Sequence, residues 1–204
     1  KHNLILIESN LGMTRPLSYH TSSINEKTGE KIEGQINGHT KVYIDEILNV
    51  EGEEILFYKE FKGNFVNGLL EGESEIEYSS TNFNSTLDMT YSGIFENGLA
   101  NGKIIFKDNR KTMIGYWNKG SFDRTKKVVC KYYDGTSYIG FFKNNHPFGE
   151  GIFRTEAYKR VEGNFCGWHV YDYNAHIITK NNIDYRGGIM FDKKHGFGIL
   201  SRFN

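Results

Sequence analysis

Residues 91–98 read Tyr91-Ser92-Gly93-Ile94-Phe95-Glu96-Asn97-Gly98, in which two aromatic residues flank a glycine and an Asn-Gly pair follows. Side chains at positions i, i+2 and i+4 of a β-strand point to the same face, so the two rings and the glycine share one side. An Asn-Gly pair favours a tight hairpin turn, because both residues tolerate positive φ. The stretch therefore predicts the first strand and the turn of a β-hairpin.

The same pattern recurs along the chain. Clear copies lie at 61–68, 113–120 and 138–145, and weaker copies lie at 161–165 and 185–189. Each copy has one anchor glycine, and these six are Gly63, Gly93, Gly115, Gly140, Gly163 and Gly187. A period near 23 residues fits every interval except the first, where the Ser/Thr/Asn-rich stretch from Ser79 to Thr90 predicts an inserted loop.

A second glycine pair follows the anchor after nine and eleven residues. The fourth copy has it as Gly149 and Gly151, and the sixth copy as Gly196 and Gly198. The third and fifth copies lack it and carry Arg124 and Asp172 at its first position. We therefore expect an irregular returning strand in the third and fifth copies.

These copies resemble the MORN family (membrane occupation and recognition nexus), whose repeat is close to YxGxWxNGxxxGxGxxxx. The resemblance covers roughly residues 61–204 and implies about six β-hairpin repeats in an all-β fold, an elongated single antiparallel sheet of stacked hairpins. Residues 1–60 are expected to form a degenerate N-terminal β cap that is continuous with the array. The segment 32–38 looks like a damaged copy, and residues 41–50 and 54–58 predict strands.

Glycine weakens a strand unless a neighbouring ring covers its bare backbone. We therefore expect the rings of one hairpin to lie over the glycines of the next, which makes the six anchor glycines repeat-packing sites. Gly140→Val should then be destabilising, whereas Gly12, outside the repeats, should tolerate the same change.

The second aromatic residue of each copy is a candidate for partner binding. A single-layer sheet cannot hide both faces, so some rings are expected at the surface, where a row of them offers a binding strip. The predicted partner-binding row is Phe65, Phe95, Trp117, Phe142 and Phe165. The competing interpretation is that these rings form the core.

The sequence offers no constellation that predicts catalysis. It lacks phosphate-binding and nucleophile-elbow motifs, its seven histidines are scattered, and no catalytic residue, cofactor or metal ligand is predicted. Its 25 basic and 25 acidic residues cancel, which disfavours nucleic acid and anionic lipid as partners. We therefore expect a protein that is not an enzyme.

The expected function is a non-enzymatic protein-binding scaffold or adaptor, because the MORN resemblance implies modules that dock other proteins. A partner could lay the apolar side of an amphipathic helix along the aromatic row. Two alternatives stay open: the non-catalytic MORN region of a larger methyltransferase or lipid kinase, and a repeat module that binds phospholipid or carbohydrate. The expected location is the cytoplasm, with association to the cytoskeleton or a membrane, and homo-oligomers, also open.

Overall fold

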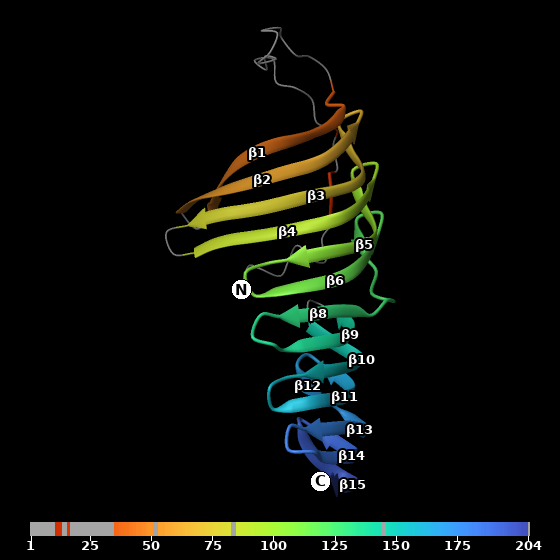
Figure 1. Ribbon diagram of the computed structural model, residues 1–204. Coiled ribbons are helices and arrows are strands. Elements are labelled where there is room, and N and C mark those ends of the chain that lie inside the picture. Colours follow the sequence, from red (N-terminus) through yellow and green to blue (C-terminus); the bar gives the residue numbers. More distant parts are fainter. Residues whose placement is uncertain are drawn as a thin grey trace. The chain divides into compact units, whose positions relative to one another are not determined.

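Strand-forming residues and tight turns account for most of the computed structural model (Figure 1), which describes residues 11–13, 16, 35–50, 53–82, 85–143 and 146–203. These residues contain no helix, and therefore none that is long and apolar enough to cross a membrane. Their strands form one open antiparallel sheet with the order β1-β2-β3-β4-β5-β6-β8-β9-β10-β11-β13-β14-β15, in which β7 pairs with β6 and β12 with β11. The fold class predicted from the sequence, an all-β sheet of successive hairpins, is confirmed.

The strand bounds follow the repeats of the sequence. They are β1 Gly38–Val50, β2 Glu53–Val66, β3 Leu69–Asn82, β4 Ser85–Glu96, β5 Leu99–Lys107, β6 Lys111–Asn118, β7 Ser121–Phe122, β8 Val128–Tyr132, β9 Ser137–Lys143, β10 His146–Arg154, β11 Tyr158–Cys166, β12 His169–Val170, β13 Asp172–Thr179, β14 Ile183–Met190 and β15 Lys193–Arg202. The chain divides into two compact units: unit 1 comprises Lys1–Asn109 and Trp117–Phe122, and unit 2 comprises Arg110–Tyr116 and Asp123–Asn204.

Each copy of the repeat supplies the first strand of one hairpin. The hairpins are β2–β3, β4–β5, β6–β7, β9–β10, β11–β12 and β14–β15. The Asn97-Gly98 turn has φ values of 50° and 79°, and Asn67-Gly68 has 51° and 77°. These angles are those of type I′ turns, so the prediction of Asn-Gly hairpin turns is confirmed.

Backbone hydrogen bonds tie each turn of unit 1 to the hairpin before it. The amide of Gly98 donates to the carbonyl of Leu70 at 2.9 Å, and that of Gly120 donates to the carbonyl of Ala100 at 2.9 Å. The amide of Gly68 donates in the same way to Ile36 at 2.8 Å. The damaged copy at 32–38 thus joins the array through its described residues. The strand β2 runs through residue 60 without a break, so the predicted cap and the array share a strand.

The returning strands bulge where the second glycine pair begins. Gly72 and Gly149 have φ values of 78° and 68°, a region that glycine enters without a steric penalty. The pairing of β9 with β10 shifts register between Pro147 and Gly151, and β2 with β3 shifts between Lys62 and Asn64. A bulge bends its strand, so these glycines mark the bend of each hairpin.

The third and fifth hairpins are irregular, as predicted. Their returning strands β7 and β12 have two residues each. In the fifth hairpin Asp172 replaces the glycine, and its carboxylate accepts hydrogen bonds from the amides of Asn164 at 2.9 Å and Asn174 at 2.8 Å. The Asp172 side chain therefore accepts hydrogen bonds from backbone amides that would pair across the two strands in a regular hairpin.

The predicted loop from Ser79 to Thr90 is wrong. The strand β3 extends to Asn82 and β4 begins at Ser85, and the two stay in register up to the pair Asn82–Ser85. The Ser79 hydroxyl donates to the Asp88 carboxylate across the strands at 2.7 Å. The extra residues lengthen both strands of one hairpin. Ser and Thr residues stand on both sides of its turn and can pair across the two strands as readily as they can form a loop.

Gly12 is also not outside the packed structure. Leu11, Gly12 and Met13 lie against the turn ends of β4–β5 and β6–β7, and Gly12 bridges to Leu99. Leu11 is 1% exposed, and Gly12 has a φ of 137°. The expectation that Gly12 tolerates Val is therefore wrong, because its side chain would have to enter the space of the neighbouring turn.

Replacing Asn97 by Val should destabilise the chain by about 1–2 kcal/mol, because a β-branched residue resists the left-handed backbone that the turn requires. Urea unfolding measures the change. Glu96→Val is the matched control, because residue 96 is exposed and in a strand, where Val is favoured. Equal unfolding midpoints for the two variants would contradict the turn assignment.

Candidate partner-binding groove

The five rings predicted to bind a partner are buried. Phe65, Phe95, Trp117, Phe142 and Phe165 have exposed fractions between 0% and 3%. The expectation that this row is exposed is wrong, and partner binding through it stays a prediction that the burial disfavours. The physical reason is visible in the repeat itself, because positions i and i+4 of a strand share a face and so both aromatic columns turn inward.

The two aromatic columns pack against each other in unit 2. The ring of Tyr138 meets that of Phe142 at a centroid distance of 5.4 Å and that of Phe165, on the next hairpin, at 5.3 Å. Both contacts are edge-to-face, an arrangement that aromatic rings prefer. The second aromatic column therefore joins neighbouring hairpins from inside.

The anchor glycines lie where a side chain would collide. A Cβ atom at Gly140 would lie closer than 3.0 Å to the hydroxyl of Tyr138, and one at Gly63 equally close to Ser74. At Gly93 and Gly187 backbone atoms of the returning strand are as close, while Gly163 has looser contacts that begin at 3.1 Å. Gly115 is buried.

In the fourth and sixth hairpins the ring over the anchor glycine comes from the same hairpin and not from the neighbouring one. The hydroxyl of Tyr138 covers Gly140 and Gly151, and it donates to the carbonyl of Phe141 at 3.2 Å. The hydroxyl of Tyr185 likewise donates to Gly188 at 2.9 Å. The expectation that rings lie over a neighbour's glycines is corrected: the tyrosine lies over its own hairpin's glycine pair and bonds to the backbone there.

An apolar groove opens in unit 2 beside this packed face. It has a volume of about 190 Å³ and is lined by Phe153, Tyr158, Val161, Phe165, Trp168, Val170, Ile177, Ile189 and Asp192. Pockets for small-molecule ligands usually measure roughly 300–1,000 Å³. The groove therefore suits one or two apolar side chains of a larger partner better than a whole small ligand.

Burial separates the floor of the groove from its walls. Val161, Phe165, Val170 and Ile189 are between 3% and 8% exposed and form the floor. Tyr158 and Trp168 are 42% and 40% exposed and stand at the walls. Of the predicted aromatic row, the groove includes Phe165.

Sequence reasoning predicted only Phe165 among the lining residues of the groove and missed the others, including the wall residue Trp168. Its ring lies 5.7 Å from that of Phe153, 5.9 Å from that of Tyr132 and 6.3 Å from that of Tyr138. The signal in the sequence was the degenerate fifth turn, where Gly167-Trp168 stands at the positions of Asn97-Gly98 in the second copy. A tryptophan at a hairpin turn leaves the strand face and can stand at a rim.

One carboxylate closes the rim of the groove. Asp192 accepts a hydrogen bond from the amide of Val170 at 2.8 Å and pairs with His169 Nδ1 at 2.5 Å. His176 lies elsewhere, with Nε2 at 3.2 Å from Asp184. The described residues include no group of three or more His, Cys, Asp or Glu side chains that could hold a metal ion.

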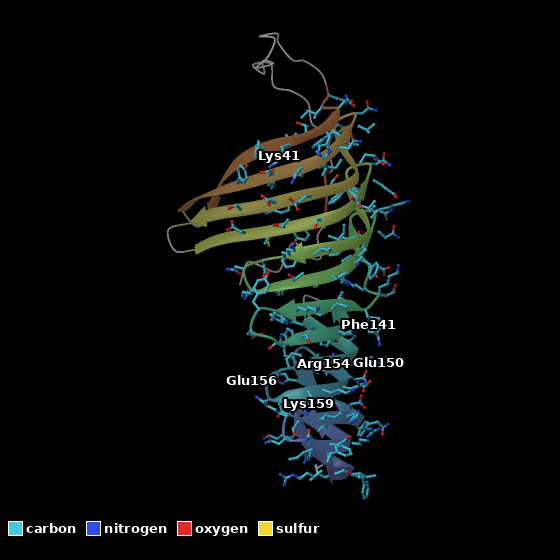
Figure 2. The ribbon with its side chains drawn as sticks, in the orientation of Figure 1. Lys41, Phe141, Glu150, Arg154, Glu156 and Lys159 are labelled. Carbon is cyan, nitrogen blue, oxygen red and sulfur yellow. The ribbon has the colours of Figure 1, made fainter. Side chains whose placement is uncertain are left out.

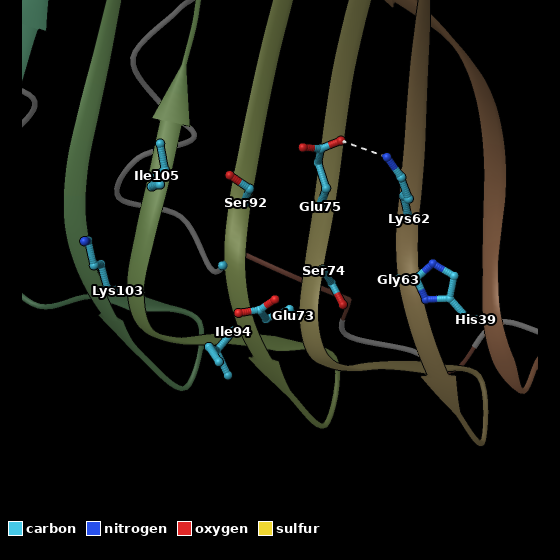
Figure 3. Close-up of a pocket in the computed structure, with 11 residues that line it drawn as sticks. His39, Lys62, Gly63, Glu73, Ser74, Glu75, Ser92, Ile94, Lys103 and Ile105 are labelled. Atoms are coloured by element: carbon cyan, nitrogen blue, oxygen red, sulfur yellow. Dashed lines mark ion pairs between the residues drawn. The ribbon is translucent and has the colours of Figure 1, made fainter.

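A larger hollow in unit 1 has a mixed polar lining (Figure 3). It measures about 480 Å³, and Lys62, Lys103, Glu73 and Glu75 contribute charges of both signs. Lys62 and Glu75 pair across it at 4.0 Å. Since these charges balance and the hollow is shallow and wide, it offers no preference for one class of ligand.

Comparison of the chain with protein-family models and with curated proteins finds no match in either case. The resemblance to MORN repeats therefore stays a prediction from the motif.

The tyrosine–glycine packing should show energetic coupling between Tyr138 and Gly151. Gly151→Ala should cost about 1–3 kcal/mol because the methyl group meets the Tyr138 hydroxyl. Adding Tyr138→Leu removes the ring, whose Cε2 and Cζ atoms would lie 2.6 Å from the added methyl group. The double variant should therefore be more stable than the sum of the single effects predicts, by about 0.5 kcal/mol or more. Additive unfolding free energies would contradict the contact.

Stability should fall above pH 10. Burial raises the pKa of Tyr78 to about 12, and burial is also the main cause that raises the pKa values of Tyr91 and Tyr138 above 10. A phenol whose pKa is higher in the folded state stabilises the fold fully below its unfolded pKa and loses that contribution as the pH rises past it. Unfolding free energies are measured between about pH 9 and 12 on the parent chain and the Tyr78→Phe variant, and the parent should lose stability relative to the variant as the pH rises through this range. A constant difference would contradict the pKa shift.

Proposed function

We propose that this chain is a non-enzymatic protein-binding scaffold or adaptor that receives apolar side chains of a partner protein in the groove of unit 2. The observation that supports this proposal most directly is that Trp168, a large ring beside the buried apolar floor of the groove, is 40% exposed. Tryptophan is enriched among the residues that dominate binding energy at protein interfaces. A half-exposed tryptophan over a preformed groove gains apolar burial on binding with little loss of side-chain freedom.

The charge of unit 2 supports an acidic partner. Its segments Arg110–Tyr116 and Asp123–Asn204 contain 15 Lys and Arg residues against eight Asp and Glu residues, a net charge of +7. Unit 1 has 10 against 17, a net charge of −7. The neutral total hid this asymmetry, so the sequence argument against anionic partners does not apply to unit 2. Figure 2 labels Arg154 and Lys159, which follow the groove residues Phe153 and Tyr158 in the sequence.

Several lysines of unit 2 lie over aromatic rings. Lys126 Nζ is 4.8 Å from the ring centre of Tyr116, and Lys127 Nζ is 5.4 Å from that of Phe141. Lys127 also lies 3.7 Å from Glu150. These lysines and rings do not line the groove, so they add to the positive charge of unit 2 outside it, where an acidic partner segment would be attracted.

An amphipathic segment with apolar residues on one side and acidic residues beside them meets these requirements. The groove would take its apolar side chains, as helix-in-groove complexes do, while basic residues outside it attract the acidic flank. The MORN resemblance supports this proposal, because such repeats are implied to dock other proteins. The same resemblance leaves open that the chain belongs to a larger enzyme or that anionic phospholipid is the ligand.

The test compares two variants of the full chain. After affinity capture and identification, each captured protein is purified and its dissociation constant measured against the parent chain and Trp168→Ala. We expect Trp168→Ala to weaken binding by about 2 kcal/mol, roughly thirtyfold. Tyr173→Ala is the matched control, because Tyr173 is 79% exposed, lies on β13 and does not line the groove, and it should bind within twofold. Equal effects of the two variants would refute the proposal.

Salt and competing ligands identify the class of partner. An acidic partner protein should bind more weakly as the salt concentration rises, because screening removes the attraction to unit 2. Anionic vesicles and single-stranded nucleic acid are tested in parallel. If either binds the parent chain and Trp168→Ala equally while no protein binds through Trp168, the charge of unit 2 serves a different ligand and the scaffold proposal fails.

A further inference from the structure

Leu11, Gly12 and Met13 dock in unit 1 as an extended peptide would. The amide of Leu11 donates to the carbonyl of Gly120 at 2.7 Å, and the amide of Met13 donates to the carbonyl of Gly98 at 2.7 Å. The carbonyl of Leu11 accepts from the amide of Ala100 at 2.9 Å. Figure 1 draws this short segment in red. Three main-chain hydrogen bonds over three residues are the pattern by which β-strand addition gives affinity.

The site accepts glycine alone at its centre. Gly12 has a φ of 137°, and a Cβ atom there would lie closer than 3.0 Å to the carbonyl oxygen of Gly98 and to the Cα of Leu99. These are backbone atoms of a tight turn, which cannot move aside cheaply. An amino acid with a side chain is therefore rejected at this position both by its backbone angle and by the contact.

The two turns also need glycine where they lie close to the docked segment. A Cβ atom at Gly98 would lie at 2.9 Å from the carbonyl oxygen of Met13, and one at Gly120 at 3.3 Å from that of Leu11. The repeat thus needs glycine at these turn positions for two reasons: their φ values of 79° and 80°, and the close approach of the docked segment.

The flanking positions of the segment require apolar side chains. Leu11 is 1% exposed and Met13 is 6% exposed. Burial of these apolar side chains stabilises the docked segment, whereas a polar side chain there would lose its hydration without gaining a partner. The order apolar–glycine–apolar is therefore a specificity rule and not a property of this one segment.

We infer that the turn ends of β4–β5 and β6–β7 form a binding site for an extended peptide segment with an apolar–glycine–apolar sequence, which Leu11–Met13 occupies in cis. A partner protein that presents such a segment binds there by displacing Leu11–Met13. The site lies in unit 1, and its existence does not depend on the groove of unit 2.

The test uses the full chain with Leu11→Ser and Met13→Ser, which weakens the occupant but leaves the turns unchanged. The probe is a synthetic peptide with the sequence of residues 9–16, and the control peptide carries Gly12→Val. The readout is hydrogen exchange at the amide of Ala100, which bonds to the docked segment. With the first peptide at about ten times its dissociation constant, exchange at Ala100 should slow by roughly tenfold, and the control peptide should have no effect. Exchange at Gly140, on the other unit, should not respond to either peptide.

Two results would overturn the inference: the first peptide fails to slow exchange up to millimolar concentration, or both peptides slow it equally.

A measurement on the unmodified chain covers the case in which the double variant does not fold. If the segment can be displaced, the amides of Leu11 and Met13 exchange through a local opening and faster than that of Ile104, which is fully buried within β5. Equal protection of the three amides would mean that the segment is a fixed part of the fold, which contradicts the site.

Discussion

Glycine at the bend of each returning strand is the constraint on which the rest of this sheet depends. Gly72, Gly102, Gly149 and Gly196 take positive φ in four of the six hairpins, and the strand pairing shifts register nearby in most of them. The bend turns both aromatic columns toward one interior, so a single sheet buries Tyr138 and Phe142 although no second layer is present among the described residues. Tyr138 and Phe142 share one face of β9, so without the bend that whole face would lie open to water.

The repeat made the hairpins predictable, because its signals are local. Asn97-Gly98 specifies its turn. Arg124 and Asp172, which replace glycine, indicate that the returning strands of the third and fifth hairpins are interrupted. The burial of the second aromatic column was within reach of the same reasoning, since Tyr138 and Phe142 are four residues apart on one strand. It was missed because a flat sheet was assumed, and the bend depends on how the register shifts between two strands.

Other features were out of reach for physical reasons. The docking of Leu11–Met13 joins residues 85 to 109 positions apart in the sequence, and no periodic pattern encodes such a contact. Trp168 lies at the wall of the groove because the fifth turn differs in sequence from the other turns. Such a difference does not predict where the side chain will point. The net charge of unit 2 could not be read from the sequence, because the opposite charges of the two units cancel in the total. The boundary that decides which residues to sum runs through β6 and the turn that follows it. The two proposed binding sites thus differ in origin: the groove lies at the degenerate fifth turn, whereas the docked segment lies on the regular turns at Gly98 and Gly120.

The central claim is that the inner aromatic face is a packed core, whereas Trp168, at the wall of the groove, is accessible to solvent. The chain has two tryptophans, Trp117 at 2% exposure and Trp168 at 40%. Acrylamide quenching of fluorescence separates them in the Trp168→Phe and Trp117→Phe variants, each of which retains one tryptophan. The account predicts that the tryptophan at 117 is quenched several times more weakly than the one at 168, and that a bound partner protects the one at 168. Equal quenching of the two in folded protein would contradict it, because the inner row would then be open to solvent.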